Sequence, residues 1–244
     1  GGSWGWSSSE TLTTLAAGII SVSVFIRTET RVQHPMLDLS MFRIRAFTAG
    51  NLAGLFSFIA IFCNVILLPF YLATVHHLTP SQIGLVITPF PLAMGLIAPV
   101  SGHLSDRISN VRLTTAGLGM VTVALFFISR FNAGTGITTV AFMQAMMGFG
   151  NGLFQSPNNN SVISSVPREK TGVAGGIGAL MRNVGMVTGT AMSVTIFQAV
   201  KKSSSASVIG AFLRGYNAAV LTGAIFAACG VVICLNRKGY AKST

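Results

Sequence analysis

The feature that most constrains this chain is a succession of apolar runs, most of them long enough to cross a lipid bilayer. The hydrocarbon core of a bilayer is about 30 Å thick, which a helix crosses in roughly 20 residues. Because lipid offers no hydrogen-bond partners to the backbone, each run is expected to be helical. The sequence therefore predicts an all-α membrane protein with about seven transmembrane helices, at residues 12–26, 46–73, 82–104, 113–129, 137–160, 172–200 and 212–235.

The low charge content supports this class. Only 9% of the 244 residues are charged, against about 25% in an ordinary soluble domain. The net charge of +11 comes mainly from Lys and Arg in the short connectors between apolar runs, so we expect no nucleic-acid binding. The three cysteines lie inside apolar runs without Cys-x-x-Cys spacing, and neither a metal site nor a disulfide framework is predicted.

The connectors differ in charge on the two sides of the membrane. Because successive spans alternate in direction, eleven Lys and Arg residues fall on one side and four on the other, while Arg182 lies within a span. Cytoplasmic loops carry the excess of basic residues. We therefore expect a multi-pass protein whose C-terminus is cytoplasmic.

Four amide side chains of the fifth run share one helical face, because they follow one another at steps of seven, four and three residues. We call this set the amide face: Gln144, Asn151, Gln155 and Asn158. One interpretation is hydrogen bonding between helices. We favour a second, in which these residues line a substrate cavity, because Gly148, Gly150 and Gly152 thin the same helix.

Arg182 lies about ten residues inside the sixth run. A charge at this depth in a membrane helix is costly. Its side chain either extends to the membrane interface or faces a cavity or a neighbouring domain. We favour the second interpretation and include Arg182 among the predicted cavity residues.

No Asp or Glu falls inside a predicted span. Proton-coupled transport usually requires a carboxylate or His within the membrane, so a coupling carboxylate is expected outside this chain. The sequence contains neither a Gly-x-x-x-x-Gly-Lys-Ser/Thr phosphate loop nor a Ser-His-Asp set. The chain is therefore predicted to be neither an ATP-driven pump nor an enzyme, and to need no cofactor besides a proton gradient as its energy source.

A short charged turn separates the third and fourth runs. Its sequence, Gly102-His103-Leu104-Ser105-Asp106-Arg107 followed by Arg112, resembles the Gly-x-Leu-x-Asp-Arg turn of the major facilitator superfamily. On this resemblance Gly102, Asp106, Arg107 and Arg112 form a conformational turn on the cytoplasmic side, with Asp106 hypothesised to pair with Arg112. Further segments resemble the fourteen-helix drug:proton antiporters of the EmrB/QacA type: His34-Pro35-Met36-Leu37-Asp38-Leu39 with Phe42-Arg43, Gly148-x-Gly150-x-Gly152 ending in Pro157, and Arg182-Asn183-Val184-Gly185.

The resemblance implies a domain organisation: a last linker helix at 1–30, a cytoplasmic connector at 31–45, a six-helix C-terminal domain built as a 3+3 inverted repeat at 46–236, and a cytoplasmic tail at 237–244. It also implies that a six-helix N-terminal domain of the same protein, absent from this chain, completes the transporter.

The activity that the resemblance implies is proton-coupled multidrug efflux by alternating access. The protein is then expected in the cell (plasma or inner) membrane, in contact with lipid, with lipophilic cations or neutral drugs as small-molecule substrates. A metabolite or siderophore exporter of the same fold is one alternative. A truncated membrane fragment without transport activity is an alternative of another class.

Overall fold

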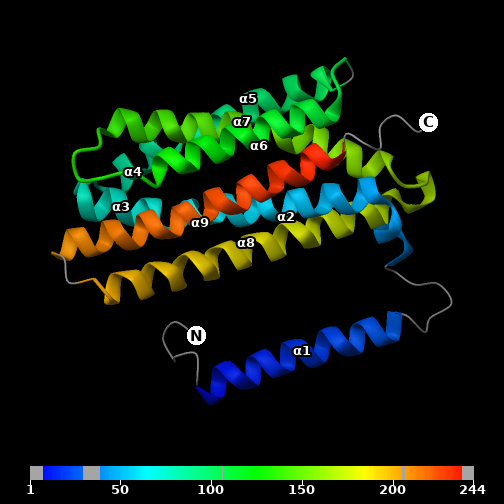
Figure 1. The fold of residues 1–244 in the computed structure, drawn as a ribbon, viewed down its shortest axis with the longest axis horizontal. Coiled ribbons are helices and arrows are strands. Elements are labelled where there is room, and N and C mark those ends of the chain that lie inside the picture. The colour runs from blue at the N-terminus through cyan, green and yellow to red at the C-terminus, as the bar shows by residue number, and fades with distance from the viewer. Residues whose placement is uncertain (1–7, 30–38, 106, 205–206, 238–244) are drawn as a thin grey trace. The chain divides into compact units, whose positions relative to one another are not determined.

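The computed structural model describes residues 8–29, 39–105, 107–204 and 207–237, and the chain separates into two compact units. The first unit, Gly1–Ser40, contains helix α1 (Ser9–Glu29), and the second, Met41–Thr244, contains all the later α-helices. All regular secondary structure of the described residues is helical (Figure 1). The prediction of an all-α protein is confirmed.

The second unit is a bundle of long helices that lie alongside one another (Figure 1). Within it α7 packs against α5 and α6, and α2 packs against α8 and α9. The helices are η1 (Leu39–Arg43), α2 (Arg45–Val65), α3 (Leu68–Val75), α4 (Pro80–Ile87), α5 (Pro89–Leu104), α6 (Asn110–Ile128), α7 (Ile137–Ser164), η2 (Arg168–Lys170), α8 (Thr171–Lys202) and α9 (Val208–Asn236).

Four helical stretches of the described residues are long and apolar enough to span a membrane: Arg45–Val75, Pro80–Leu104, Asn110–Ile128 and Val208–Asn236. They coincide with the second, third, fourth and seventh predicted runs. Helices α7 and α8 have 28 and 32 residues, which at about 1.5 Å per residue exceeds the bilayer core. Their many small and polar residues keep them less apolar than the other four stretches.

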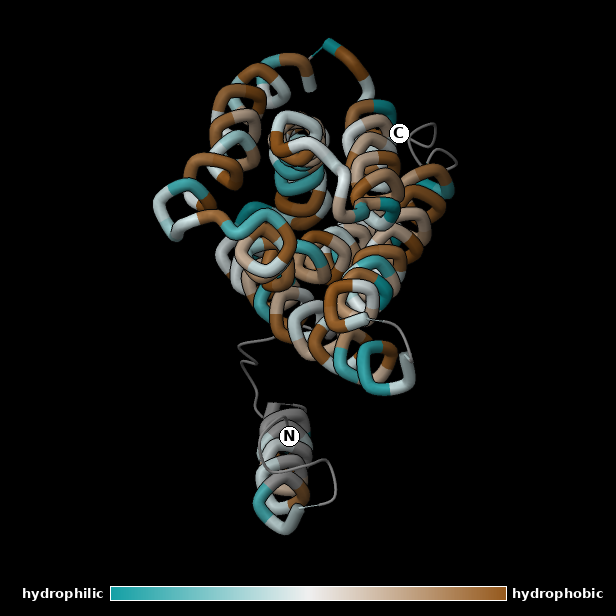
Figure 2. Tube along the Cα trace, turned by 90° about the vertical axis from the view of Figure 1, so that its left-hand side faces the viewer, coloured by the Kyte–Doolittle hydropathy of each residue, from teal (hydrophilic) through white to brown (hydrophobic). Residues whose placement is uncertain are grey.

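Much of the second unit consists of apolar residues, drawn in brown in Figure 2, and many large apolar side chains are exposed. Leu85, Leu96 and Val187 are 72%, 73% and 70% exposed. Apolar side chains exposed in such number would aggregate in water, so these faces require lipid or another apolar partner. The chain is an integral membrane protein.

Two of the membrane stretches are interrupted near prolines. Helices α2 and α3 are separated at residues 66–67, just before Pro69, and α4 and α5 are separated at Thr88, just before Pro89. Proline lacks a backbone N–H and crowds the preceding helical turn. Both interruptions lie beside the cavity described below.

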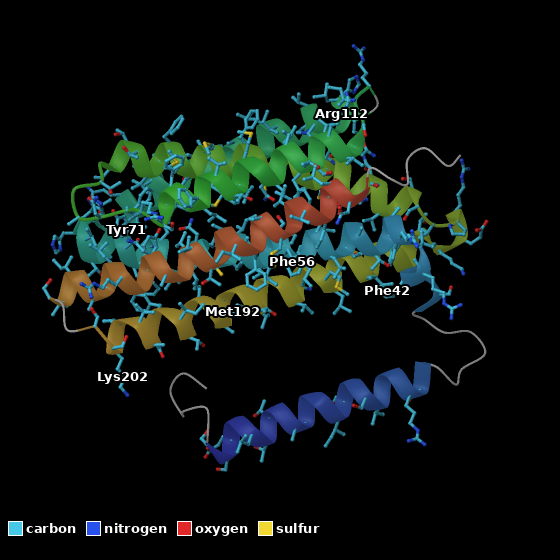
Figure 3. All side chains as sticks on the ribbon, in the orientation of Figure 1. Phe42, Phe56, Tyr71, Arg112, Met192 and Lys202 are labelled. Carbon is cyan, nitrogen blue, oxygen red and sulfur yellow. The ribbon has the colours of Figure 1, made fainter. Side chains whose placement is uncertain are left out.

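The two ends of this bundle are named after residues labelled in Figure 3. At the Arg112 end, α5, α7 and α9 end while α2, α6 and α8 begin. At the Tyr71 end, α3 ends while α7 and α9 begin.

Helices α6 and α7 are in backbone contact through two glycines. A Cβ added to Gly117 would lie 2.6 Å from the carbonyl oxygen of Gly150, and one added to Gly150 would lie 2.7 Å from that of Gly117. Neither position has room for a methyl group, because such distances are well inside van der Waals contact. This close approach fixes the position of α7, which carries the amide face.

We expect Gly117→Ala to lower the thermal unfolding temperature of the complete purified protein by several degrees, because overpacking a close contact costs about 1–3 kcal/mol. Gly119→Ala on the same helix is the control, since no atom lies within 4 Å of its added Cβ. Both substitutions gain the same helix propensity, so unfolding followed by tryptophan fluorescence in detergent isolates the packing effect. Equal unfolding temperatures for the two variants would contradict this contact.

Candidate functional site

A cavity of about 590 Å³ opens between α2, α5, α7 and α8, beside the two helix interruptions. Its walls are mainly apolar and include Phe58, Phe62 and Phe90. Its polar lining comes from α7, which contributes four amides, and from α8, which contributes one guanidinium: Gln144, Asn151, Gln155, Asn159 and Arg182. A mostly apolar cavity with a few convergent polar groups is typical of a small-molecule site.

The structure brings together four of the five predicted cavity residues, namely Gln144, Asn151, Gln155 and Arg182. Asn158, the fifth, does not line this cavity. It lies in a hollow of about 20 Å³ next to it, which Gln155 and Arg182 also border. Asn158 is only 3% exposed, and its amide is bonded on both sides, as described below. Asn159, which the sequence reasoning did not select, lines the large cavity instead.

Gln144 is held in place by two buried residues of other helices. The Asn64 amide of α2 donates to Gln144 Oε1 at 3.0 Å, and the Tyr216 hydroxyl of α9 donates to Asn64 Oδ1 at 2.9 Å. All three side chains are at most 1% exposed. Because its carbonyl is used in this bond, Gln144 is left with its NH₂ group as a donor.

Tyr216 continues this network to the Tyr71 end. Its ring stacks on Tyr71 with centroids 5.0 Å apart, and the Tyr71 hydroxyl donates to the carbonyl oxygen of Asn132 at 2.9 Å. His76 Nε2 lies 3.2 Å from the same hydroxyl. The turn between α6 and α7 is thereby tied to the residues that orient Gln144. Sequence reasoning missed Asn64, although a lone amide within an apolar run is itself a signal.

We expect Tyr216→Phe to destabilise the protein by about 1–3 kcal/mol, because it leaves the buried Asn64 Oδ1 without its donor. The double variant Asn64→Leu/Tyr216→Phe removes both polar groups and is expected to lose less than the sum of the single variants. Unfolding midpoints of the three variants measure this coupling. Strictly additive losses would show that the two side chains do not act together.

Asn151 is the least satisfied residue of the amide face. It is 3% exposed, its NH₂ group has Met94 Sδ at 3.2 Å, and its Oδ1 is buried without a hydrogen-bond partner. Sulfur is a weak acceptor. A buried carbonyl without a donor is costly, and this one belongs to a side chain that lines the large cavity.

Arg182 projects from α8 beside α2. Its guanidinium carbon lies 5.8 Å from the centroid of the Phe58 ring, within the range of a cation–π contact. Within the part of the chain that the structure describes, no carboxylate pairs with Arg182. Arg182 is also the only charged residue among those described that line the large cavity.

Arg237 forms a second polar cluster at the Arg112 end. Nη1 donates to Asn158 Oδ1 at 3.0 Å, and Nη2 donates to Ser161 Oγ at 2.7 Å and to the Ala46 carbonyl oxygen at 3.3 Å. The Asn158 NH₂ group donates to the Gly50 carbonyl oxygen at 3.1 Å. Arg237 therefore joins α2, α7 and the end of α9, where a cation also interacts favourably with the helix dipole.

The burial of Arg237 differs from the sequence interpretation, which assigned it to a polar tail. The side chain is 6% exposed. Burial lowers the pKa of Arg237, but an arginine with so high an ordinary pKa stays charged. Its charge is stabilised by neutral oxygen acceptors of α2 and α7, which no local pattern near residue 237 reveals.

We expect Arg237→Ala to destabilise the protein by about 2–3 kcal/mol, because it removes hydrogen bonds to a charged group and leaves Asn158 without one partner. Arg214→Ala is the matched control, since Arg214 is an exposed arginine of α9, the helix that Arg237 directly follows. Thermal unfolding of both purified variants tests this. A loss no larger than that of the control would exclude a structural role for Arg237.

The charged turn lies at the Arg112 end. The side chains of Arg107 and Arg112 are exposed, and a Cβ added to Gly102 would lie 3.0 Å from Ser156 Oγ of α7. Asp106, like His34, Pro35, Met36, Leu37 and Asp38, lies outside the described residues. The pairing of Asp106 with Arg112 therefore stays a prediction.

Interrupted apolar helices around a cavity with a polar lining are typical of multi-pass membrane carriers. Residues 50–239 match the family model described as Major Facilitator Superfamily, and the chain belongs to this superfamily. The proteins of this superfamily are transporters and not enzymes.

Two relatives and one solved structure show the range of similarity. The chain is 34% identical to the riboflavin transporter RibZ of Clostridioides difficile over 207 residues, which cover 81% of this chain and 45% of that protein. It is 27% identical to the lincomycin resistance protein LmrB of Listeria monocytogenes over 242 residues, which cover 96% and 51%. The chain thus spans about half the length of these relatives.

The solved structure is that of a bacterial homologue of the human drug peptide transporters PepT1 and PepT2. It superimposes with a TM-score of 0.69 at 17% sequence identity, covering 80% of this chain and 42% of that one. At this identity the comparison establishes a shared fold and nothing about substrate.

Proposed function

We propose that this chain supplies the C-terminal half of a multidrug exporter of the fourteen-helix EmrB/QacA type, which works by alternating access. The observation that carries the proposal is the cavity of about 590 Å³, whose aromatic and amide lining suits amphipathic molecules. The similarity to a lincomycin resistance protein supports drug export.

The second half of the cavity wall comes, in this proposal, from an N-terminal domain that precedes this chain. The relatives are about twice as long as the matched region, which leaves room for such a domain. The cavity lining within the described residues contains no Asp, Glu or His. A proton-coupled mechanism then needs its titrating carboxylate on the N-terminal domain.

The Arg112 end is cytoplasmic in this proposal. Arg107, Arg112, Arg168, Lys170 and Arg237 belong to it, whereas the Tyr71 end carries Arg130, Lys201, Lys202 and Arg214. The positive-inside rule favours this orientation in the cell membrane, with the C-terminus in the cytoplasm. A cysteine introduced at Ser204 is then expected to react with a membrane-impermeant maleimide added outside intact cells.

A metabolite exporter is the second candidate, because one relative is a riboflavin transporter. Four amides in the cavity offer donors and acceptors that suit a polar heterocycle as well as a drug. Riboflavin movement across membranes that contain the complete protein distinguishes this candidate from drug export.

The proposal is tested by expressing the complete protein in cells that lack their main drug exporters. We expect lower drug susceptibility and faster efflux of fluorescent amphipathic dyes, with both effects abolished by a protonophore. Gln155→Leu, which removes a cavity amide, is expected to slow efflux severalfold at unchanged protein level. Gln198→Leu is the control, because Gln198 is an exposed residue of α8.

Two outcomes would overturn export of drugs. If neither dyes nor drugs leave the cells faster than in an empty-vector strain, the multidrug proposal is wrong. If Gln155→Leu and Gln198→Leu slow efflux equally, the cavity is not the transport site.

A further inference from the structure

Arg182 gives the large cavity a charge that the described residues do not balance. Among the residues that the structure describes, it is the only charged side chain in the lining, and no described carboxylate pairs with it. Glu169, the nearest described acid before it in sequence, lies thirteen residues away, about 20 Å along a helix. Arg182 is exposed and lines the cavity. A guanidinium in this position attracts anions and repels cations, and the effect grows as water is excluded from around it.

The second observation is an unpartnered amide oxygen on Asn151, a residue that lines the same cavity. Asn151 Oδ1 is buried without a hydrogen-bond donor, and Asn151 as a whole is only 3% exposed. A buried acceptor of this kind is satisfied when a ligand brings an N–H or O–H group to it. Gln155, one helical turn further along α7, supplies a second amide on the same wall.

The third observation is the apolar part of the wall. Phe58, which lies under the Arg182 guanidinium, and Phe62 and Phe90 line the same space. Aromatic rings of a ligand pack well against such side chains. The complementary molecule is therefore aromatic, carries an acidic group toward Arg182, and offers a hydrogen-bond donor toward Asn151.

We propose that this site selects amphipathic organic anions over lipophilic cations, and that Arg182 is the residue that determines this selectivity. The inference rests on the proposed export function and specifies its substrate class. It differs from the lipophilic cations that the family resemblance alone suggests. A guanidinium suits this role because it binds a carboxylate through two parallel hydrogen bonds and keeps its charge at all physiological pH values.

The test uses two dyes with the same xanthene ring system and opposite charge: fluorescein, an anion, and rhodamine 123, a cation. Fluorescence anisotropy measures the binding of each dye to the complete purified protein in detergent. We expect fluorescein to bind roughly tenfold more tightly than rhodamine 123. Arg182→Gln is expected to weaken fluorescein binding by a similar factor and to leave rhodamine 123 binding unchanged or stronger.

Two further variants show whether the charge itself is responsible. Arg182→Lys keeps the positive charge and is expected to preserve most of the preference for the anion. Arg130→Gln removes a cation that packs on the Phe126 ring, away from the cavity lining, and is expected to leave both affinities unchanged. Thermal unfolding of each variant verifies that it is folded.

Three results would overturn the selectivity: absent fluorescein binding, equal affinity for the two dyes, or fluorescein binding that is insensitive to Arg182→Gln. Dye efflux from cells separates this inference from the proposed export. If fluorescein binding depends on Arg182 but neither dye is exported, the proposed export function is wrong and the proposed anion selectivity is supported. If both dyes are exported equally well, export stands and the selectivity is wrong.

Discussion

The packing of the second unit depends on one constraint: polar side chains in an apolar surrounding need hydrogen-bond partners. Helix α7 meets this need differently at three levels, spaced by seven residues or about 10 Å. At Gln144 the amide is bonded to Asn64, and at Asn158 it is bonded to Gly50 and Arg237. At Asn151, between them, the carbonyl oxygen has no partner. The bonded levels hold α7 to α2 and α9, and the unsatisfied level lies in the cavity wall.

This arrangement explains which parts of the site the sequence could predict. The steps of seven, four and three residues were enough to find the amide face, because they follow from helix geometry alone. They could not show which amides are already bonded, because the partners are distant in sequence. Asn64 is 80 residues from Gln144, and Arg237 is 79 residues from Asn158. The structure places Asn158 in the small hollow beside the cavity, bonded to Arg237, and sequence reasoning missed the structural role of Arg237.

The same limit applies to the fold. Hydropathy finds the helices whose outer faces are apolar, but it ranks α7 and α8 lower because their small and polar residues serve packing and the cavity. The spacing of glycines shows that a helix can approach another helix closely, but it does not show which helix that is. Gly185 and Gly189 meet the backbone of α2 at Leu55 and Ile59, whereas Gly172 and Gly176 have the same spacing and no atom within 4 Å of an added Cβ. Which glycines contact another helix can be learned only from the three-dimensional structure.

Under the proposed export by alternating access, the unpaired charge of Arg182 links substrate binding to the conformational change. In the open cavity its guanidinium is exposed and stacks on Phe58, so its desolvation is limited. Closing the cavity around it would bury an unneutralised cation, which is strongly unfavourable. An anionic substrate removes this penalty because it enters the closed state as the missing counter-ion. A ligand shifts a conformational equilibrium only by its difference in affinity for the two states. Under the proposed selectivity an anion at Arg182 provides such a difference, so that the occluded state forms with substrate bound and is disfavoured when the cavity is empty.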